Sequence, residues 1–433
     1  MKLAVIGTGY VGLVTAVCLA EKGHEVICID NDEKKINLLQ NGEIPIYEKN
    51  LEYLMKKNID RLIYTSKYEL AYKEADVIFI AVGTPEKLDG NANLNYLWNV
   101  IYEISGNMSW ECLLVIKSNV PIVKVEKINN YLLNNNLDGS KFHIVSNPEF
   151  LSQGTAVEDT LNASRIIIGT TDKYAESVML DVYKDFNVPK LITNHQSAEM
   201  IKYASNDFLA LKISYINEIA NLCEIIGANI SDVTKGMAYD SRIGSKFLNA
   251  GVGYGGSCFP KDTKALHWMS TLYGKELKTI KAAIEVNEQQ KFTLIKKAEK
   301  YYDSLFGKKV AVLGVTFKPG TDDLREAPSI VNINVLLDEG AHVYAYDPVG
   351  LKHLKNIYGD RISFCDDVKD ALYNADICLI FTEWTEIKNL TYDDFKLMHK
   401  PVIIDGRNCF SLDFMIDLPV VYDSIGRDTI KNI

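Results

Sequence analysis

A glycine motif near the N-terminus limits the fold of this chain more than any other feature. The apolar run Leu3 to Ile6 leads directly into Gly7-Thr8-Gly9-Tyr10-Val11-Gly12. A helical stretch, Leu13 to Lys22, follows, and a second apolar run from Glu25 to Ile29 ends at Asp30. The three glycines allow a tight turn, close approach of the backbone to a pyrophosphate, and close helix–strand packing. The N-terminus therefore predicts a dinucleotide-binding βαβ unit, with a ligand-free glycine turn as the alternative.

Asp30 indicates which dinucleotide this unit prefers. A carboxylate at the end of the second strand accepts hydrogen bonds from ribose hydroxyls and repels a 2′-phosphate, which favours NAD over NADP. Lys34 and Lys35 lie nearby and weaken that preference. Val82-Gly83-Thr84-Pro85 ends another expected strand, so Thr84 is a candidate cofactor neighbour, although an ordinary proline turn would look the same.

The rest of the chain continues this pattern in two blocks around a helical middle. Helical stretches separate most of the further apolar runs at 77–82, 113–116, 143–145 and 166–168, as expected for parallel strands covered on both faces. A long helical pattern covers 197–226, a glycine-rich loop covers 251–256, and helices continue to about Tyr302. The strand pattern restarts at Lys309, with further runs at 342–346, 377–381 and 402–404.

We therefore predict an α/β protein with two Rossmann-like, doubly wound parallel-sheet domains joined by a long central helix and a helical middle domain. The expected boundaries are 1–196, 197–302 and 303–433.

Composition excludes several classes of protein. The 433 residues are 47% hydrophobic and 24% charged, with a net charge of −10, which argues against a broad nucleic-acid surface but allows a local basic phosphate pocket. There is no apolar run of about 18 residues, so no membrane span is expected. Glycines 7, 9 and 12 argue against a signal peptide. The eight cysteines form no CxxC pair, which is typical of reduced thiols in a cytoplasmic protein, and we expect no metal.

One cysteine stands in a different setting. The thiol of Cys258 follows a glycine-rich loop, and a cation, Lys261, stands three residues later. The full run is Gly253-Tyr254-Gly255-Gly256-Ser257-Cys258-Phe259-Pro260-Lys261-Asp262. Such surroundings favour a reactive thiolate. A purely structural loop is the alternative on local grounds.

The chain resembles the UDP-glucose/GDP-mannose dehydrogenase family over essentially its whole length. The matching blocks are 7–12, 82–85, Asn147-Pro148-Glu149-Phe150-Leu151, 202–206, Asp240-Ser241-Arg242-Ile243-Gly244, 253–262, 317–325 and Asp405-Gly406-Arg407. The resemblance implies an NAD-dependent, four-electron oxidation of a nucleotide-sugar CH2OH to a carboxylate, through a thiohemiacetal and a thioester on Cys258. The product would serve as a polysaccharide precursor.

The resemblance implies catalytic roles residue by residue. Cys258 would be the nucleophile, Lys202 and Asn206 would stabilise the oxyanion, Glu149 would act as a base or position water, and Asp262 would join the base network. The four-residue spacing of Lys202 and Asn206 independently places both on one helix face, although a solvated face has the same spacing.

The resemblance also implies two sets of contacts and a dimer. Cofactor contacts would be Gly7, Gly9, Tyr10, Val11, Gly12, Asp30, Lys35, Thr84, Asn119, Lys261 and Arg325. Substrate contacts would be Glu149, Phe150, Leu151, Lys202, Asn206, Arg242, Phe247, Asn249, Gly255, Lys318 and Arg407, with Arg242 reaching the neighbouring subunit. A homodimer would form through the central helix, whose apolar residues include Phe208, Leu211, Ile213, Tyr215, Ile216 and Ile219; burial of that helix within one chain is the alternative.

The sequence departs from the family pattern in three segments. Asn119 stands where the family often has threonine, which puts the details of water handling in doubt. Gln153 stands where a second acid is frequent, and Asp32, Glu33 and Lys35 differ from the arginine-bearing adenosine-ribose loop.

The substrate remains open on sequence alone. The run Cys258-Phe259-Pro260-Lys261-Asp262 is more similar to members that act on UDP-glucose, while GDP-mannose and N-acetylated UDP-hexoses are the alternatives. A single-step β-hydroxyacid dehydrogenase needs no cysteine and would release one NADH. A non-catalytic NAD-binding module would leave Cys258, Lys202 and Asn206 unexplained.

Overall fold

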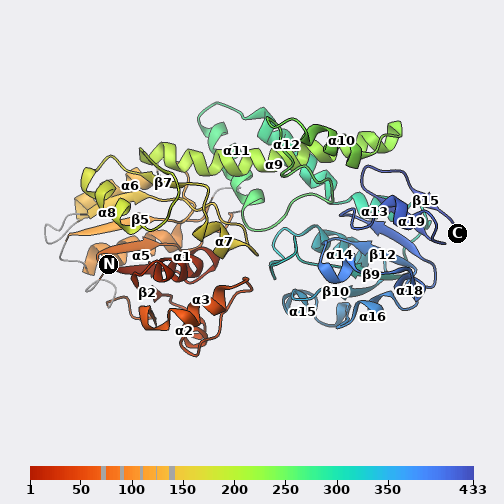
Figure 1. The fold of residues 1–433 in the computed structure, drawn as a ribbon, viewed down its shortest axis with the longest axis horizontal. Coiled ribbons are helices and arrows are strands. Elements are labelled where there is room, and N and C mark those ends of the chain that lie inside the picture. Colours follow the sequence, from red (N-terminus) through yellow and green to blue (C-terminus); the bar gives the residue numbers. More distant parts are fainter. Residues whose placement is uncertain (70–74, 88–91, 108–110, 123, 136–141) are drawn as a thin grey trace. The chain divides into compact units, whose positions relative to one another are not determined.

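The computed structural model describes residues 1–69, 75–87, 92–107, 111–122, 124–135 and 142–433. The chain divides into two compact units, Met1–Ser205 and Asn206–Ile433 (Figure 1). Both units are built on a mostly parallel sheet with flanking helices, which confirms the predicted α/β class.

The first unit contains an eight-stranded sheet in the order β3-β2-β1-β4-β5-β6-β7-β8. All neighbouring strands are parallel except β6 and β7, which share one antiparallel pair, Ser146 with Gly169. The strands are β1 (Lys2–Ile6), β2 (Glu25–Ile29), β3 (Leu62–Thr65), β4 (Val77–Ile80), β5 (Cys112–Ile116), β6 (Phe142–Ser146), β7 (Ile166–Gly169) and β8 (Lys190–Thr193).

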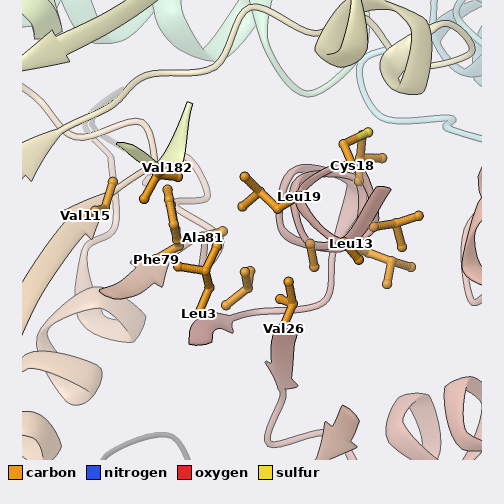
Figure 2. Close-up of a cluster of buried hydrophobic side chains, with 14 of the residues drawn as sticks. Leu3, Leu13, Cys18, Leu19, Val26, Phe79, Ala81, Val115 and Val182 are labelled. Atoms are coloured by element: carbon orange, nitrogen blue, oxygen red, sulfur yellow. The ribbon is translucent and has the colours of Figure 1, made fainter. Parts of the chain in front are cut away.

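Helices cover both faces of this sheet, and the core lies between them and the strands. Within β1, Leu3 and Val5 join one cluster, whereas Ala4 and Ile6 join the cluster on the opposite face, so every residue after Lys2 is apolar and buried. Figure 2 shows Leu13 and Leu19 of the first helix beside strand residues of that first cluster. The helices are α1 (Tyr10–Glu21), α2 (Glu33–Gln40), α3 (Leu51–Lys57), α5 (Asn95–Asn107), α6 (Lys124–Asn135), α7 (Ala156–Leu161) and α8 (Lys173–Val182), with a 3-10 turn at Ile59–Arg61.

The second unit repeats the first arrangement at smaller size. Its seven-stranded sheet has the order β11-β10-β9-β12-β13-β14-β15, and only β15 is antiparallel to its neighbour. The strands are β9 (Lys309–Leu313), β10 (His342–Tyr346), β11 (Ser363–Phe364), β12 (Ile377–Ile380), β13 (Val402–Asp405), β14 (Val421–Ser424) and β15 (Ile430–Lys431). Two hydrophobic clusters again fill its two faces.

A helical region precedes this sheet in the chain. It includes the 32-residue helix α9 (His195–Ile226), which contains the boundary between the units and begins two residues before the predicted start. The same region contains α10 (Ile230–Ala238), α11 (Phe259–Leu272), α12 (Lys278–Gln290) and α13 (Thr293–Ala298). The helices that alternate with the strands of the second sheet are α14 (Pro328–Asp338), α15 (Leu351–Tyr358), α16 (Val368–Leu372), α17 (Thr385–Lys388), α18 (Tyr392–Phe395) and α19 (Leu412–Met415), with a 3-10 turn at Gly359–Arg361. Over the described ranges, no helix has the length and apolar character needed to cross a bilayer.

Candidate active site

The three glycines of the first loop have different surroundings. Gly7 has φ +98°, and a Cβ there would lie 2.7 Å from the carbonyl oxygen of Ala81. A Cβ on Gly12 would lie only 1.8 Å from the carbonyl oxygen of Gly7, so helix and loop touch at this point. Gly9, the N-cap of α1, has no atom within 4 Å of the position its Cβ would take. Gly7 and Gly12 thus serve packing, while Gly9 leaves open space in front of the helix N-terminus.

Asp30 lies beside this loop at the end of β2. Its Oδ2 accepts hydrogen bonds from the backbone N–H and the hydroxyl of Thr8, both at 2.8 Å, and its Oδ1 accepts from the N–H of Asp32 at 3.0 Å. Burial alone would raise the pKa of Asp30, but these bonds and Lys35 outweigh it and lower the pKa. Asp30 is therefore a charged acceptor at the edge of the glycine loop.

The sheet order places the candidate cofactor loops together. Strand β1 lies between β2 and β4, so the chain moves outward in opposite directions on its two sides, and ligands of such folds bind at this point. Buried Thr84 follows β4, and Asn119 follows β5. Tyr10, the first residue of α1, donates its hydroxyl hydrogen bond to the carbonyl of Tyr47 at 3.1 Å.

A buried ion pair follows β6 in the first unit. Glu149 accepts a hydrogen bond from the ammonium of Lys202 at 2.8 Å and another from the backbone N–H of Leu151 at 2.9 Å. The side chains of Glu149 and Lys202 are only 5% and 4% exposed. The Phe150 ring carries the Arg165 guanidinium at 3.8 Å and the Lys202 ammonium at 5.6 Å from its centroid. These residues place one carboxylate and two cations around an aromatic ring.

A pocket in the first unit includes Lys202. Its lining residues come from the ends of β5 and β6, the segment after β5, and α9, and they are Ile116, Ser118, Asn119, Val120, Val125, Ser146, Pro148, Glu199, Lys202 and Tyr203. The pocket combines the candidate cofactor residue Asn119 with the candidate catalytic residue Lys202.

Buried Lys117, which the sequence reasoning missed, lies beneath this region. Its ammonium donates to the side-chain oxygen of Asn147 at 3.0 Å, and the Tyr183 hydroxyl donates to the same oxygen at 2.6 Å. Burial lowers the pKa of Lys117 to about 8, against the opposing effect of the Glu149 charge. Its signal in the sequence was its position at a strand end, as the first residue of the motif in which Asn119 departs from the family pattern.

Glu48, also missed, holds the segment that follows Glu149. Its two carboxylate oxygens accept from the backbone N–H groups of Gly154 at 2.7 Å and Ala156 at 2.8 Å, which places a charge at the N-terminus of α7. The two partners are 106 and 108 residues away in sequence, so no local pattern could have revealed this contact.

Cys258 lies in the second unit as the N-cap of α11 and is partly exposed. The N-terminus of a helix carries a partial positive charge that favours a thiolate. No disulfide involves any of the eight cysteines, all of which are described; six are buried, and the other partly exposed one, Cys409, has its pKa raised by burial and by Asp405. Cys258 alone combines partial exposure with a helix N-terminus.

The glycines before Cys258 pack against protein. A Cβ on Gly253 would lie 2.7 Å from the Asn287 side chain, one on Gly255 would lie 2.4 Å from the carbonyl oxygen of Glu326, and one on Gly256 would lie 2.8 Å from the Phe317 ring. The Gly256 N–H also donates to the carbonyl of Arg325 at 2.8 Å. The loop that presents Cys258 is therefore fixed against the segment after β9.

Asn206 and Asp262 meet in the second unit. The Asn206 amide donates to Asp262 Oδ2 at 2.7 Å, and the Lys261 ammonium lies 3.1 Å from Asp262 Oδ1. Asp262 itself is fully buried, one turn after Cys258, and its N–H donates to the Cys258 carbonyl at 2.8 Å. Asn206, Lys261 and Asp262 thus lie together beside the N-terminal turn of the helix that Cys258 caps.

The candidate cations of the second unit have different partners. Arg407 donates to the carbonyls of Phe381 at 2.8 Å and Phe317 at 3.2 Å, and it lies 3.5 Å from Glu383. Arg325 and Arg242 each pair with the aspartate two residues earlier, and their side chains are 62% and 88% exposed. Lys318 lies 5.6 Å from the Phe317 ring centroid.

Two further predicted contacts lie in the loop before Cys258. Phe247 has φ +64° and its ring lies 6.2 Å from that of Phe259, while Asn249 is exposed. Lys202 and Asn206 are four residues apart on α9, as predicted.

Comparison with known proteins decides the family. The UDP-glucose/GDP-mannose dehydrogenase family models match in order: the NAD binding domain over residues 1–187, the central domain over 196–289 and the UDP binding domain over 311–412. The chain belongs to the UDP-glucose/GDP-mannose dehydrogenase family. The resemblance inferred from the motifs is confirmed, and with it NAD as the cofactor, a nucleotide-sugar substrate and the class of NAD-dependent dehydrogenase.

Individual members of this dehydrogenase family match nearly the whole chain. The UDP-glucose 6-dehydrogenase TuaD of Bacillus subtilis is 45% identical, covering 99% of this chain and 94% of its own length. A UDP-glucose dehydrogenase structure from Pyrobaculum islandicum has a TM-score of 0.92 at 36% identity, covering 99% and 98%. The UDP-N-acetyl-mannosamine dehydrogenase Cap5O of Staphylococcus aureus has a TM-score of 0.81 at 26% identity, covering 98% of each chain.

Proposed function

We propose that the chain oxidises UDP-glucose to UDP-glucuronate through a thioester on Cys258. The observation that carries this proposal is the position of Cys258, a partly exposed thiol at the N-terminus of α11, four residues before the buried Asp262. A dehydrogenase that stops at an aldehyde or ketone has no use for such a thiol. The names of the UDP-glucose relatives support the choice of sugar.

The first unit has the features that hold NAD. Gly9 leaves room for the pyrophosphate at the N-terminus of α1, whose first turn contains no acidic residue. Asp30 keeps a charged carboxylate for the ribose hydroxyls while bonded to Thr8. Bound NAD supplies the acceptor for the hydride in each of the two oxidations.

The residues of the chain account for the remaining steps. The sugar C6 alcohol loses a hydride and a proton to give the aldehyde, and the Cys258 sulfur adds to its carbonyl carbon to give a thiohemiacetal. Lys202 and Asn206 stabilise the negative oxygen at this stage. Loss of a second hydride gives the thioester, and water, positioned by Glu149 and Asp262, releases the carboxylate and returns the thiol.

The second unit suits the nucleotide part of the substrate. Arg407 follows β13 and is fixed by two carbonyls, so its guanidinium is already oriented for an anionic group. Lys318 follows β9, the strand next to β12 at the point where the sheet order reverses. We assign both to the UDP moiety, and Arg242, exposed and paired only with its neighbour Asp240 among the described residues, to the site of a second subunit.

We also propose a homodimer formed through α9. Phe208, Tyr215 and Leu222 are 61%, 49% and 50% exposed and recur every seven residues, which gives one apolar stripe along the helix. A second copy of the same stripe is the self-complementary partner that a two-fold interface needs. The same proposal includes three domains, with boundaries at 1–196, 197–302 and 303–433. It also includes a cytoplasmic location and a role in polysaccharide precursor synthesis.

The deciding experiment counts NADH formed per substrate consumed across UDP-glucose, GDP-mannose, UDP-N-acetylglucosamine and UDP-N-acetylmannosamine. We expect UDP-glucose to give the highest kcat/KM, with two NADH per sugar. One NADH per sugar would contradict the thioester route, and preference for another sugar would contradict the substrate assignment.

A trapping experiment tests the covalent step separately. Glu149→Gln should slow hydrolysis so that intact-protein mass spectrometry detects a glycosyl acyl adduct on Cys258. Cys258→Ala provides the control without adduct, because alanine has no nucleophilic atom. Absence of the adduct under single-turnover and steady-state conditions would contradict a role for Cys258 as nucleophile.

A further inference from the structure

A second buried carboxyl group lies beside the Asn206–Asp262 pair, and the mechanism above does not use it. Asp207 follows Asn206 on α9 and is 1% exposed. Neither of its carboxyl oxygens has a hydrogen-bond partner in the described part of the chain. A buried carboxylate without partners is strongly disfavoured, so the group must either keep its proton or be stabilised in another way.

Over the described ranges, the groups that act on the charge of Asp207 do not include a cation. Asp262 of α11 raises the pKa of Asp207 through its negative charge, in addition to the larger effect of burial, and the pKa reaches about 8. Burial raises the pKa of Tyr254, in the glycine-rich loop, to about 12, and the charges of Asp207 and of Glu288 in α12 act in the same direction. This phenol therefore remains neutral. The ammonium of Lys261 lies 3.1 Å from Asp262 Oδ1 and thus pairs with Asp262.

Asp262, by contrast, has the partners of an ionised carboxylate. It accepts from the Asn206 amide at 2.7 Å and lies against the Lys261 ammonium. Two like charges held close together do not both ionise readily, so one of two neighbouring carboxyl groups keeps its proton. The contacts decide which one: Asp262 has the donors, and Asp207 has none among the described residues.

We propose that Asp207 is a positioning residue that carries a proton in the active protein and thereby keeps Asp262 ionised and bonded to Asn206. The catalytic part of this inference rests on the proposed function, because there Asp262 belongs to the base network of the thioester chemistry. Ionisation of Asp207 places a second negative charge beside Asp262, and the repulsion between the two carboxylates weakens the bond that holds Asp262 to the Asn206 amide. Asp207 thus sets the alkaline limit of turnover.

The first test measures the proton itself and needs no activity. Below about pH 4, Asp207 is protonated in both the folded and the unfolded chain. As the pH rises to 8, only the unfolded chain releases this proton, so the folded state loses stability relative to Asp207→Asn. We therefore expect the Tm of Asp207→Asn minus that of the parent to increase steadily between pH 4 and 8.

The control for this test is Asp232→Asn, which makes the same change at an exposed position in the first turn of α10. Its Tm difference from the parent should not vary with pH in the same way. A pH-independent Tm difference for Asp207→Asn would overturn the proposal, because it would show that Asp207 ionises in the folded protein as it does in the unfolded chain.

The second test follows kcat for UDP-glucose against pH. Asp207→Asn should move the alkaline limb of the profile upward by about one pH unit or more, because the like charge beside Asp262 can no longer form. The KM for UDP-glucose should change less than kcat above pH 8. If the Tm difference increases with pH but the alkaline limb of the kcat profile does not move in Asp207→Asn, the proposed effect of Asp207 on Asp262 is overturned. Absence of turnover in the parent would count against the proposed function alone, since the Tm comparison would still report the proton.

Discussion

Single residues in the two glycine-rich loops are required for different physical reasons. In the first loop, Gly12 has no room for a side chain because a Cβ would lie 1.8 Å from the carbonyl oxygen of Gly7. Gly9 has room in the protein alone, so a side chain there would collide only with a ligand. Gly255, before Cys258, is enclosed by the backbone of Glu326. The motif predicted separate roles for Gly9 and Gly12, whereas the enclosure of Gly255 depends on tertiary packing.

This difference predicts that alanine at Gly12 lowers stability, whereas alanine at Gly9 lowers the affinity for NAD. Gly12→Ala should lower the free energy of unfolding by on the order of 4 kcal/mol, because the backbone of Gly7 must move. Gly9→Ala should leave the Tm close to that of the parent but weaken NAD binding by about tenfold or more, which needs only about 1.4 kcal/mol. Calorimetric titration with NAD and thermal unfolding separate the two; equal loss of stability in both would contradict the assignment of Gly9 to the cofactor.

The buried Lys202–Glu149 pair makes a second prediction at this scale. Lys202→Ala removes a donor to the oxyanion and should lower kcat by about a hundredfold or more. Because loss of one partner of a buried ion pair also destabilises the fold, the double variant Lys202→Met with Glu149→Gln is the control. It should regain Tm without regaining turnover. A loss of less than tenfold in Lys202→Ala would exclude Lys202 from the chemistry.

At the scale of elements, polar contacts between the ends of strands and helices tie the first unit together. His143 of β6 bonds to Glu111, which precedes β5, at 2.9 Å, and to Asp172, the N-cap of α8. Burial opposes protonation of this imidazole, but the two carboxylates outweigh it and raise the pKa of His143. The three elements are therefore held most firmly when His143 is charged.

The direction of this shift predicts how stability depends on pH. A raised folded-state pKa means that the contribution of His143 is fully present below the unfolded-state pKa of about 6.5 and is lost as pH rises through the folded value. The Tm difference between the parent and His143→Gln should therefore be largest near pH 6 and shrink toward pH 9. The same substitution at the exposed His399 is the control, and a difference that grows with pH would contradict the contact.

The apolar stripe on α9 gives the second prediction at the element scale. Leu222→Glu places a charge in the proposed dimer contact and should convert the dimer to a monomer, as measured by light scattering after gel filtration. Leu272→Glu makes the same change at a position that is 65% exposed near the end of α11 and should leave the assembly unchanged. An unchanged molecular mass for Leu222→Glu would contradict association through this stripe.

Elements were easier to predict from the sequence than their long-range contacts. The strand–turn–helix from Lys2 to Glu21 follows from local glycine and apolar patterns, so the first loop could be predicted, although the helix begins at Tyr10 rather than Leu13. The bonds from Glu48 to residues more than 100 positions away, and the isolation of Asp207 in the core, depend on tertiary packing and leave no local signature. The family resemblance supplied the roles of Glu149 and Lys202, but not the ion pair between them.

At the scale of the whole molecule, the two sheets share strand order and local detail. In both, the first four strands are arranged 3-2-1-4, and the residue after the first strand is a glycine with positive φ, Gly7 at +98° and Gly314 at +76°. The N–H of each glycine donates to the carbonyl at the end of the second strand, Ile29 at 2.7 Å and Tyr346 at 2.8 Å. An aspartate follows that strand in each unit, Asp30 and Asp347. The second unit thus repeats the framework of a dinucleotide site.

The two aspartates differ in their remaining capacity to accept hydrogen bonds from a ligand. Asp347 is 2% exposed and already accepts six hydrogen bonds, from Val315, twice from Thr316, and from Val349, Gly350 and Trp384. Both carboxylate oxygens of Asp347 are therefore occupied by bonds within the protein, and they cannot accept hydrogen bonds from the hydroxyls of an adenosine ribose. Calorimetric titration should accordingly count one NAD per polypeptide, lost on Asp30→Ala, and a second NAD-binding event would contradict this. The repeated framework can therefore serve two different nucleotides at once without their competing for the same half of the chain.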